Sequence, residues 1–416
     1  MSLPTFPPEL ISFITDYLFP SIQDVNSLAR TSKLLHRSTN PILYHYHLVH
    51  QGSAILIWAA KHGKPDPCYR FLREGANPNI RDPAHGRTPL SWAAELTHKD
   101  VVAVLLLSDE TDPNAPDKHA CTPLFWAAGN PRQSLSTMPS PYLSIPTADT
   151  LSLIMPGDDL AIVKMLVSHK DTQPDCRNKR GETPLAIAAA DGAEHVVEML
   201  LRTGKVDVNS KDKHGQTPLM AAARIGHIRI VKHLLAIDGV DVDTRSESGD
   251  SPLMSAARHG HAEIVQLLLD IPTVDPNHQP SFGDPALLIA VANGHVDVVE
   301  VLLASEKVDP NLPNRRGVTA IARAAQRNRA QIMRMLLDKG VEPDERDGEG
   351  NTPLEIASER GHIQIVKLLL STGRVQLFEL TNRKRAPFWA MSQLKANVVE
   401  ALEDYKRRQG GPELDS

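Results

Sequence analysis

The feature that most constrains this chain is a sequence unit that returns every 34 residues. It is plainest in ETPLAIAAADGAEHVVEMLL and QTPLMAAARIGHIRIVKHLL. The Thr of the TPL triplet recurs, with substitutions, at Thr88, Thr122, Thr183, Thr217, Ser251, Pro285, Thr319 and Thr352. The intervals are 34 residues except for one of 61 and one of 33, and a step of 34 outward reaches Ala54 and Ala386. This gives ten units, of which the outer two are degenerate.

Each unit is predicted to open with a short helix. A Thr or Ser hydroxyl can accept a hydrogen bond from an unpaired amide at a helix start, and Pro fits the first helical position because no amide proton is needed there. Nine residues after the Thr position stands a residue type that tolerates the left-handed conformation of a helix end. These residues are Gly63, Gly192, Gly226, Gly260, Gly294, Asn328 and Gly361.

A second helix is predicted after the helix-ending residue. Ile230, Val231, Leu234 and Leu235 have the spacing i, i+1, i+4, i+5, which places them on one helix face. An extended segment such as VDVN follows, and then a polar stretch with Gly two residues before the next Thr position, which predicts a turn. These turn glycines are Gly86, Gly181, Gly215, Gly249, Gly283, Gly317 and Gly350. The recurrent His227, His261, His295 and His362 follow a helix-ending Gly, and we expect them to belong to the local structure of the repeat.

Two short helices and a turn cannot enclose a core, so each unit must be stabilised by stacking on its neighbours. The unit resembles the ankyrin repeat, over about residues 52–408. The resemblance implies an all-α solenoid of about ten units with short β-turn or hairpin fingers, which captures a protein partner on its concave face. Residues 409–416 are expected to form a flexible tail.

The interval of 61 residues places an insertion at about 129–157. Its sequence, GNPRQSLSTMPSPYLSIPTADTLSLIMPG, contains five Pro, which prevent a regular helix or a central strand. We expect a loop between the two helices of the third unit. A tolerated insertion is favoured over a docking or phosphorylation segment.

Partner recognition is expected where the units differ. The turn stretches differ, and so does the third residue after the Thr position. We therefore expect an apolar strip on the concave face, formed by Phe125, Trp126, Met220, Met254 and Leu288 with Phe282 nearby. The alternative is that these side chains form the core between repeats.

The first fifty residues do not follow the repeat, and three short amphipathic helices are predicted there. The stretches PPELISFITDYL and DVNSLARTSKLLHRSTNPILY resemble the F-box carried by fungal ankyrin proteins. The resemblance implies that this segment binds the adaptor subunit of a cullin-based ubiquitin ligase while the array captures the substrate. Carried over by position, the adaptor-facing or core residues are Pro8, Leu10, Ile11, Ile14, Leu18, Leu28, Leu34 and Leu35. The alternative is a scaffold protein in which residues 1–50 only cap the solenoid.

Composition and motifs limit the remaining function classes. The net charge of −5 shows no basic excess of the kind that binds nucleic acid, and no apolar run is long enough for a membrane span. Three scattered cysteines predict neither a disulfide framework nor a zinc site, and they favour an intracellular location, cytoplasmic or nuclear. No phosphate-binding or hydrolase motif is present, so we expect a monomeric binding protein without catalytic residues, cofactor or metal. His45, His47 and His50 are interpreted as surface residues.

Overall fold

The computed structural model describes residues 54–129, 158–280, 283–375 and 396–408. These residues form helices joined by turns, with no β-strand among them, so the predicted all-α repeat architecture is confirmed. The helices expected in residues 1–50, the insertion between α8 and α11, and the terminal tail lie outside the described residues.

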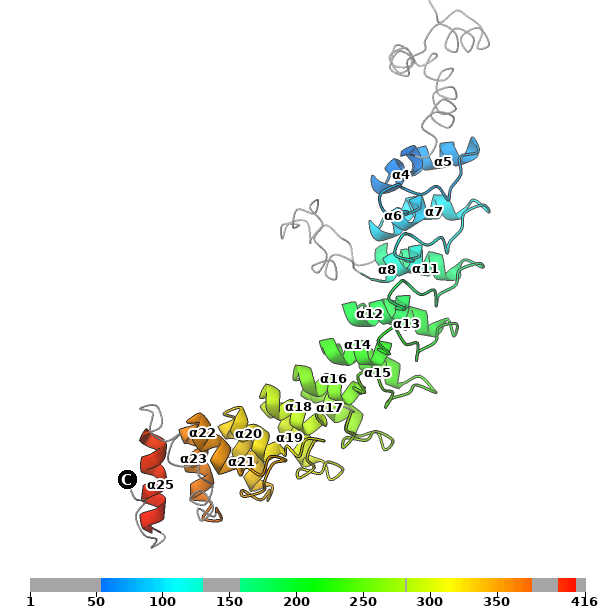
Figure 1. Ribbon diagram of the computed structural model, residues 1–416. Helices are drawn as coiled ribbons and strands as arrows, with labels where there is room; N and C mark the ends of the chain where they lie inside the picture. Colours follow the sequence, from blue (N-terminus) through cyan, green and yellow to red (C-terminus); the bar gives the residue numbers. More distant parts are fainter. Residues whose placement is uncertain (1–53, 130–157, 281–282, 376–395, 409–416) are drawn as a thin grey trace, which may run out of the picture. The chain divides into compact units, whose positions relative to one another are not determined.

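The chain divides into two compact units, residues 1–212 and residues 213–416. In each unit the described helices come in pairs, one pair per repeat, except for the last helix of the second unit, α25 (Figure 1). The helices of the first unit are α4 (Ala54–Lys61), α5 (Pro65–Arg73), α6 (Pro89–Glu95), α7 (Lys99–Leu106), α8 (Pro123–Ala128), α11 (Asp158–Ser168), α12 (Pro184–Asp191) and α13 (Glu194–Arg202). Those of the second unit are α14 (Pro218–Ile225), α15 (Ile228–Leu235), α16 (Pro252–His259), α17 (Ala262–Leu269), α18 (Ala286–Asn293), α19 (Val296–Ala304), α20 (Ala320–Gln326), α21 (Ala330–Asp338), α22 (Pro353–Arg360), α23 (Ile363–Ser371) and α25 (Ala396–Arg408).

The predicted hydroxyl caps are confirmed at the starts of the first helices. At α12 the Ala186 amide donates to Thr183 Oγ1 over 3.3 Å. The same bond from the amide three residues on is present at Thr88, Thr122, Thr217, Ser251, Thr319 and Thr352. Pro285 has no hydroxyl, and α18 accordingly starts without a side-chain cap. The caps fix where each first helix begins along the chain.

The predicted helix-ending residues are also confirmed. Gly260 closes α16 with φ of 82°, in the left-handed region. Positive φ is found likewise at Gly63, Gly192, Gly226, Gly294, Asn328 and Gly361. Six of the seven turn glycines have positive φ too, namely Gly86, Gly181, Gly215, Gly249, Gly317 and Gly350.

A polar contact joins each of several repeats to the preceding one. The ring of His295, at the start of α19, lies 3.0 Å from the Arg258 carbonyl oxygen of α16. His98, His261 and His362 make the same contact with the carbonyls of Lys61, Arg224 and Ala325. The His295 ring also lies against Gly260, so closely that a Cβ there would be 2.8 Å from Nδ1. The predicted structural role is confirmed for His261, His295 and His362, and it acts between repeats.

A second polar contact joins the extended segments that precede the turns. Asn79 accepts the Asp112 amide over 2.8 Å and donates to the Glu110 carbonyl over 2.7 Å. Asn114 and Asn277 make the same two bonds to the following repeat. Asp175 stands at this position in the third repeat, where it accepts the Asp207 amide over 2.7 Å but cannot donate as a carboxylate. Its other oxygen, Oδ1, is buried without a hydrogen-bond partner among the described residues.

The apolar core lies between stacked helices. Within the first unit α6 packs between α4 and α8, and α7 packs between α5 and α11. The second-helix stripe is fully enclosed, as Val102 and Leu105 of α7 are 0% exposed. Ala residues on the first helices, such as Ala93, are equally buried and allow close approach of neighbouring repeats.

Candidate functional site

We call the turns that precede the Thr positions finger turns, and those before Thr88 and Thr122 are each held by an acidic side chain that points inward. Asp82 Oδ1 accepts the amides of His85 and Arg87 over 3.0 and 2.9 Å. Asp117 Oδ1 accepts the amides of His119 and Cys121 over 2.7 and 2.9 Å. Both acids are buried, so their carboxylates stabilise the turns and contribute little to the exposed surface.

The local environment of Asp82 favours its charged form. Burial acts to raise the pKa of this carboxyl, but the hydrogen bonds from the Arg87 amide, the His85 ring and the His85 amide outweigh burial, so its pKa lies below the ordinary value. Lys61 Nζ lies 3.9 Å from Asp82 Oδ2. The carboxylate is therefore ionised and neutralised within the repeat.

The outer positions of the same turns carry cations. Lys118 and His119 form the exposed tip of the second finger, and Lys179 and Arg180 form that of the third. Adjacent tips are joined by backbone bonds, because the Lys118 amide donates to the His85 carbonyl over 2.9 Å and the Lys179 amide to the His119 carbonyl over 2.8 Å. We call these five residues the basic ridge.

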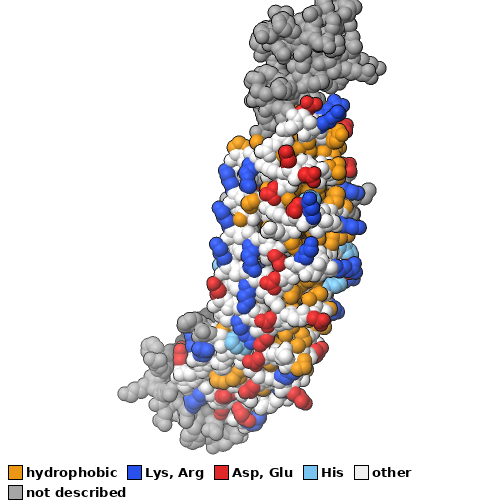
Figure 2. Space-filling model, turned by 90° about the vertical axis from the view of Figure 1, so that its right-hand side faces the viewer, with side chains coloured by type: hydrophobic (Ala, Val, Ile, Leu, Met, Phe, Trp, Pro, Cys, Tyr) orange, Lys and Arg blue, Asp and Glu red, His pale blue; other side chains and the backbone are white. Residues whose placement is uncertain are grey.

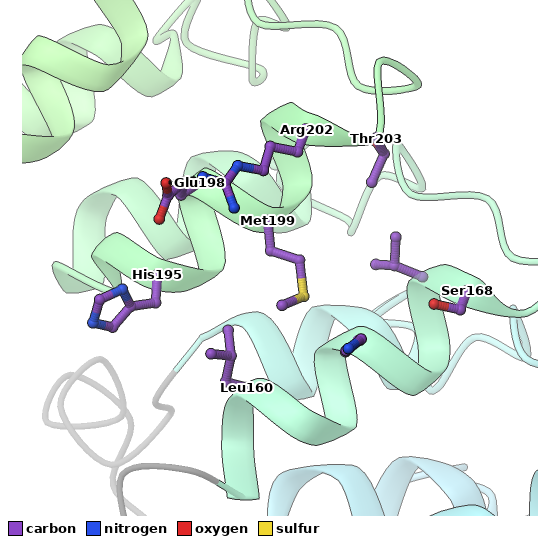
Figure 3. A pocket seen from close by; sticks show the side chains of 9 residues that line it. Leu160, Ser168, His195, Glu198, Met199, Arg202 and Thr203 are labelled. Carbon is purple, nitrogen blue, oxygen red and sulfur yellow. Dashed lines mark hydrogen bonds and ion pairs between the residues drawn. The ribbon is translucent and has the colours of Figure 1, made fainter.

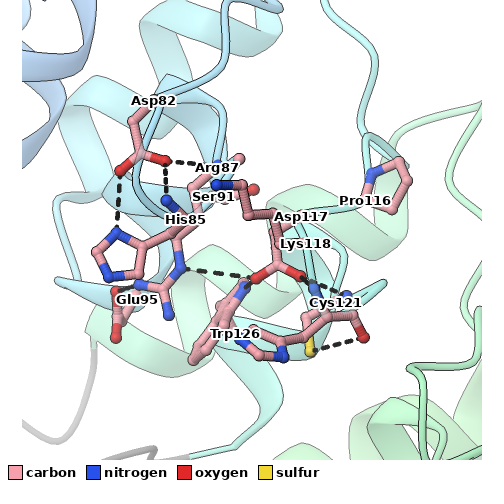
Figure 4. A network of polar contacts seen from close by, with 12 residues as sticks. Asp82, His85, Arg87, Ser91, Glu95, Pro116, Asp117, Lys118, Cys121 and Trp126 are labelled. Atoms are coloured by element: carbon pink, nitrogen blue, oxygen red, sulfur yellow. Dashed lines mark hydrogen bonds and ion pairs between the residues drawn. The ribbon is translucent and has the colours of Figure 1, made fainter. Parts of the chain in front are cut away.

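Beside the fingers, Arg87 contacts two tryptophans, of which Trp126 is labelled in Figure 4. Its guanidinium carbon lies 3.6 Å from the Trp126 ring centroid and 4.5 Å from that of Trp92. Arg87 also pairs with Glu95, and its Nε lies 3.6 Å from Asp117 Oδ2, which accepts Trp126 Nε1 over 3.2 Å. The guanidinium is thus enclosed by π faces and by two carboxylates.

The tryptophans recur at the same position of the first three repeats, in IWAAK, SWAAE and FWAAG. Trp126 is 9% exposed and Trp58 is 48% exposed. Lys61 Nζ lies 3.9 Å above the Trp92 ring, and the Trp58 ring stacks on His62 with centroids 4.7 Å apart. Sequence reasoning missed Trp58, Trp92 and Arg87, although the triplet WAA repeated at 34 residues was a visible signal.

The expected apolar strip is not a surface. Met220 is 0% exposed, Met254 and Leu288 are each 1% exposed, and Phe125 and Trp126 are buried against Cys121 and Ile187. The reason is that the third residue after the Thr position faces the neighbouring first helix, as in the packing of α14 on α16. The position one residue further on is 48% exposed at Trp58, whereas it is buried at Trp126 and Ile289. These side chains thus form core, the alternative left open by the sequence, and Phe282 lies outside the described residues.

The F-box-like positions lie outside the described residues as well. They are Pro8, Leu10, Ile11, Ile14, Leu18, Leu28, Leu34 and Leu35.

A groove of about 390 Å³ lies between the second helices α11 and α13 of the first unit (Figure 3). Leu160 and Met199 contribute apolar side chains, while Glu198 and Arg202 form an ion pair of 2.6 Å at its edge. The groove offers a shallow apolar surface.

The described part of the chain contains no group of three or more His, Cys, Asp or Glu side chains placed to hold a metal ion. Nor does any described helix have the length and hydropathy required to cross a membrane. On the face drawn in Figure 2, Lys and Arg side chains form a column with Asp and Glu side chains largely beside it.

Stacked helix pairs, capped by Thr and joined by finger turns, define a helical-repeat solenoid. The chain belongs to the ankyrin-repeat family, since the family model for ankyrin repeats in three copies matches residues 56–137, 152–246, 235–314 and 287–379. Membership assigns the protein a role in protein–protein interaction. The chain is also 40% identical over 82 residues to the human neurogenic locus notch homolog protein 4, a match covering 20% of this chain and 4% of that protein.

Proposed function

We propose that this chain is a non-enzymatic binding protein that captures another protein on the first-helix and finger side of its first unit. The observation that carries the proposal is Trp58, whose large apolar ring is 48% exposed on α4. Tryptophan is enriched among the residues that dominate binding energy, because it buries a large area with little loss of side-chain freedom.

The surroundings of Trp58 support this role because they are ordered before binding. The His62 ring stacks on Trp58, and its Nδ1 lies 2.8 Å from the Trp58 carbonyl oxygen. On the next first helix, Trp92 is held between Lys61 and Arg87. Side chains fixed in this way lose less entropy when a partner docks.

The test compares the proteins retained by the full chain with those retained by Trp58→Ala. Leu107→Ala is the matched control, because Leu107 is 78% exposed and follows the second helix α7. We expect a reproducible set of proteins on the parent chain and on Leu107→Ala, and its loss on Trp58→Ala. An identical set on all three chains would contradict the proposal.

A finer role is proposed for the opening segment, in which the captured protein is the substrate of a cullin-type ubiquitin ligase. The F-box-like order of Pro8, Leu10, Ile11 and Ile14 supports it. The paired substitution Leu10→Asp with Ile14→Asp should abolish co-purification of the ligase adaptor, since charges on an apolar docking face oppose burial. If the parent chain retains no adaptor, the scaffold alternative stands, with residues 1–50 as a solenoid cap.

A further inference from the structure

We propose that the basic ridge of the first unit binds an extended acidic segment of the captured protein. This inference rests on the proposed function and adds the chemistry of the partner. The ridge consists of His85, Lys118, His119, Lys179 and Arg180, all exposed on consecutive finger tips.

The first argument is the separation of charges within the fingers. Asp82 and Asp117 point inward and are buried. Asp82 Oδ2 lies 3.1 Å from Nδ1 of His85 and 3.9 Å from Lys61 Nζ, while Asp117 Oδ2 lies 3.6 Å from Arg87 Nε. His85 is thus partnered by Asp82, and the outward positive charge of the ridge belongs to Lys118, Lys179 and Arg180 on the second and third tips.

The second argument is that the ridge cations are available. Lys118 Nζ donates to the carbonyl oxygens of Pro83 and Ala84 over 2.6 and 3.0 Å, which orients the ammonium without cancelling its charge. Lys179 and Arg180 have no ion-pair partner among the described residues. Glu182, the acid nearest in sequence, accepts from Asn178 Nδ2 over 2.7 Å.

The third argument concerns spacing. Backbone bonds between His85 and Lys118, and between His119 and Lys179, fix one tip against the next. Stacked helices lie about 8–10 Å apart, and an extended chain advances about 3.3 Å per residue. An extended partner with an acidic residue at every third position thus places one carboxylate at each tip.

The charge is not dictated by the turn itself, because the tips of the second unit vary. Glu247 with Ser248 and Gly348 with Glu349 occupy two of them, whereas Lys213 with His214 and Arg315 with Arg316 are basic. The second unit also offers a matched control in Arg315 and Arg316, which occupy a turn of the same design. Asn314 accepts the amides of Arg316 and Val318 there, as Asn178 accepts those of Arg180 and Glu182.

The test is fluorescence anisotropy with the full chain and a labelled peptide of repeated Glu-Gly-Ser triplets. We expect Lys179→Glu with Arg180→Glu to weaken binding at least about tenfold, because attraction becomes repulsion, while Arg315→Glu with Arg316→Glu leaves it unchanged. A peptide of the same composition with its Glu residues contiguous should bind more weakly. Salt at about 1 M, where the Debye length is about 3 Å, should remove the difference between the variants.

Three outcomes would overturn the proposal: no salt-dependent binding of the triplet peptide, equal losses in both paired variants, or single-stranded RNA bound as tightly as the peptide. Unchanged circular dichroism and thermal midpoints show that the paired variants are folded. The proposed function is tested separately, because loss of the retained proteins on Trp58→Ala stands whether or not the ridge binds the peptide.

Discussion

At the scale of single residues, Arg87 combines several kinds of contact in the first unit. It lies against two indole rings and two carboxylates and is 7% exposed. An arginine suits this place because its planar guanidinium can stack and pair at the same time.

Replacing Arg87 by Ala should destabilise the first unit by about 3 kcal/mol, since it leaves Asp117 buried without its cation. Urea unfolding followed by tryptophan fluorescence measures the change. The control is Arg202→Ala, which removes an exposed pair with Glu198 and should cost no more than about 0.5 kcal/mol. Equal losses of unfolding free energy in the two variants would show that the burial of Arg87 does not increase its contribution to stability.

The position of Asp175 does not favour the charged form of its side chain. Burial, the largest cause, raises the pKa of this carboxyl, with the Asp207 charge adding to it, and the Asp207 amide opposes the change. A raised folded-state pKa means that stability is highest below the unfolded pKa and falls as pH rises through the folded pKa. At neutral pH the charged Asp175 is therefore a source of instability.

Asp175→Asn should stabilise the protein at pH 7 by about 1 kcal/mol, because an amide can accept the Asp207 amide and also donate, as Asn79 and Asn114 do. The gain should shrink at about pH 3, where the carboxyl is protonated in both states. Chemical unfolding of both chains at the two pH values measures it. A gain in stability of the same size at both pH values would show that the charge of the Asp175 carboxylate is not what destabilises the protein.

At the scale of elements, the end of one helix and the start of another share a single contact. Gly260 ends α16 in the left-handed region, and the His295 ring of α19 covers it. The glycine is thus required twice, once for its backbone conformation and once for its missing side chain.

Gly260→Ala should therefore cost more than Gly239→Ala, although both glycines have φ of 82°. A Cβ at Gly239 meets nothing within 4 Å, so its cost is the left-handed conformation alone, about 1 kcal/mol. At Gly260 the ring must move as well and lose its bond to the Arg258 carbonyl, which adds about 1 kcal/mol. Hydrogen exchange of the α16–α19 amides measures the difference, and equal loss of protection in both variants would rule out the ring contact.

At the scale of the whole molecule, the sequence was sufficient to predict the repeat and its helices, but it was insufficient to predict which side chains are exposed. Period, hydroxyl caps and helix-ending glycines are local signals, and the structure confirms them at Thr183 and Gly260 among others. The side of a helix that meets its neighbour depends on stacking, so the strip at Met220 and Met254 was assigned to the wrong face. The inward direction of Asp82 and Asp117 depends on hydrogen bonds that no spacing rule contains.

A repeat protein distributes its stability along the chain, since each repeat contacts only its neighbours. Arg87→Ala should thus lower hydrogen-exchange protection in α6 and α8 and leave α18–α22 unchanged. Mass spectrometry of the intact chain under exchange provides the comparison. A uniform fall in protection over both units would show a single cooperative structure instead.

The finger turns also have a consequence for how this protein changes over time. Asn178 holds the backbone of the third finger from inside, so the side chains of Lys179 and Arg180 are not needed to form this turn. Pairs such as Lys179 with Arg180 can therefore be substituted without changing the turn. A tip sequence moved from one repeat to another would bring its charge, and hence its preferred partner chemistry, to the new repeat. The array can thus acquire a new partner through substitutions at the tips, while the helices of the solenoid remain unchanged.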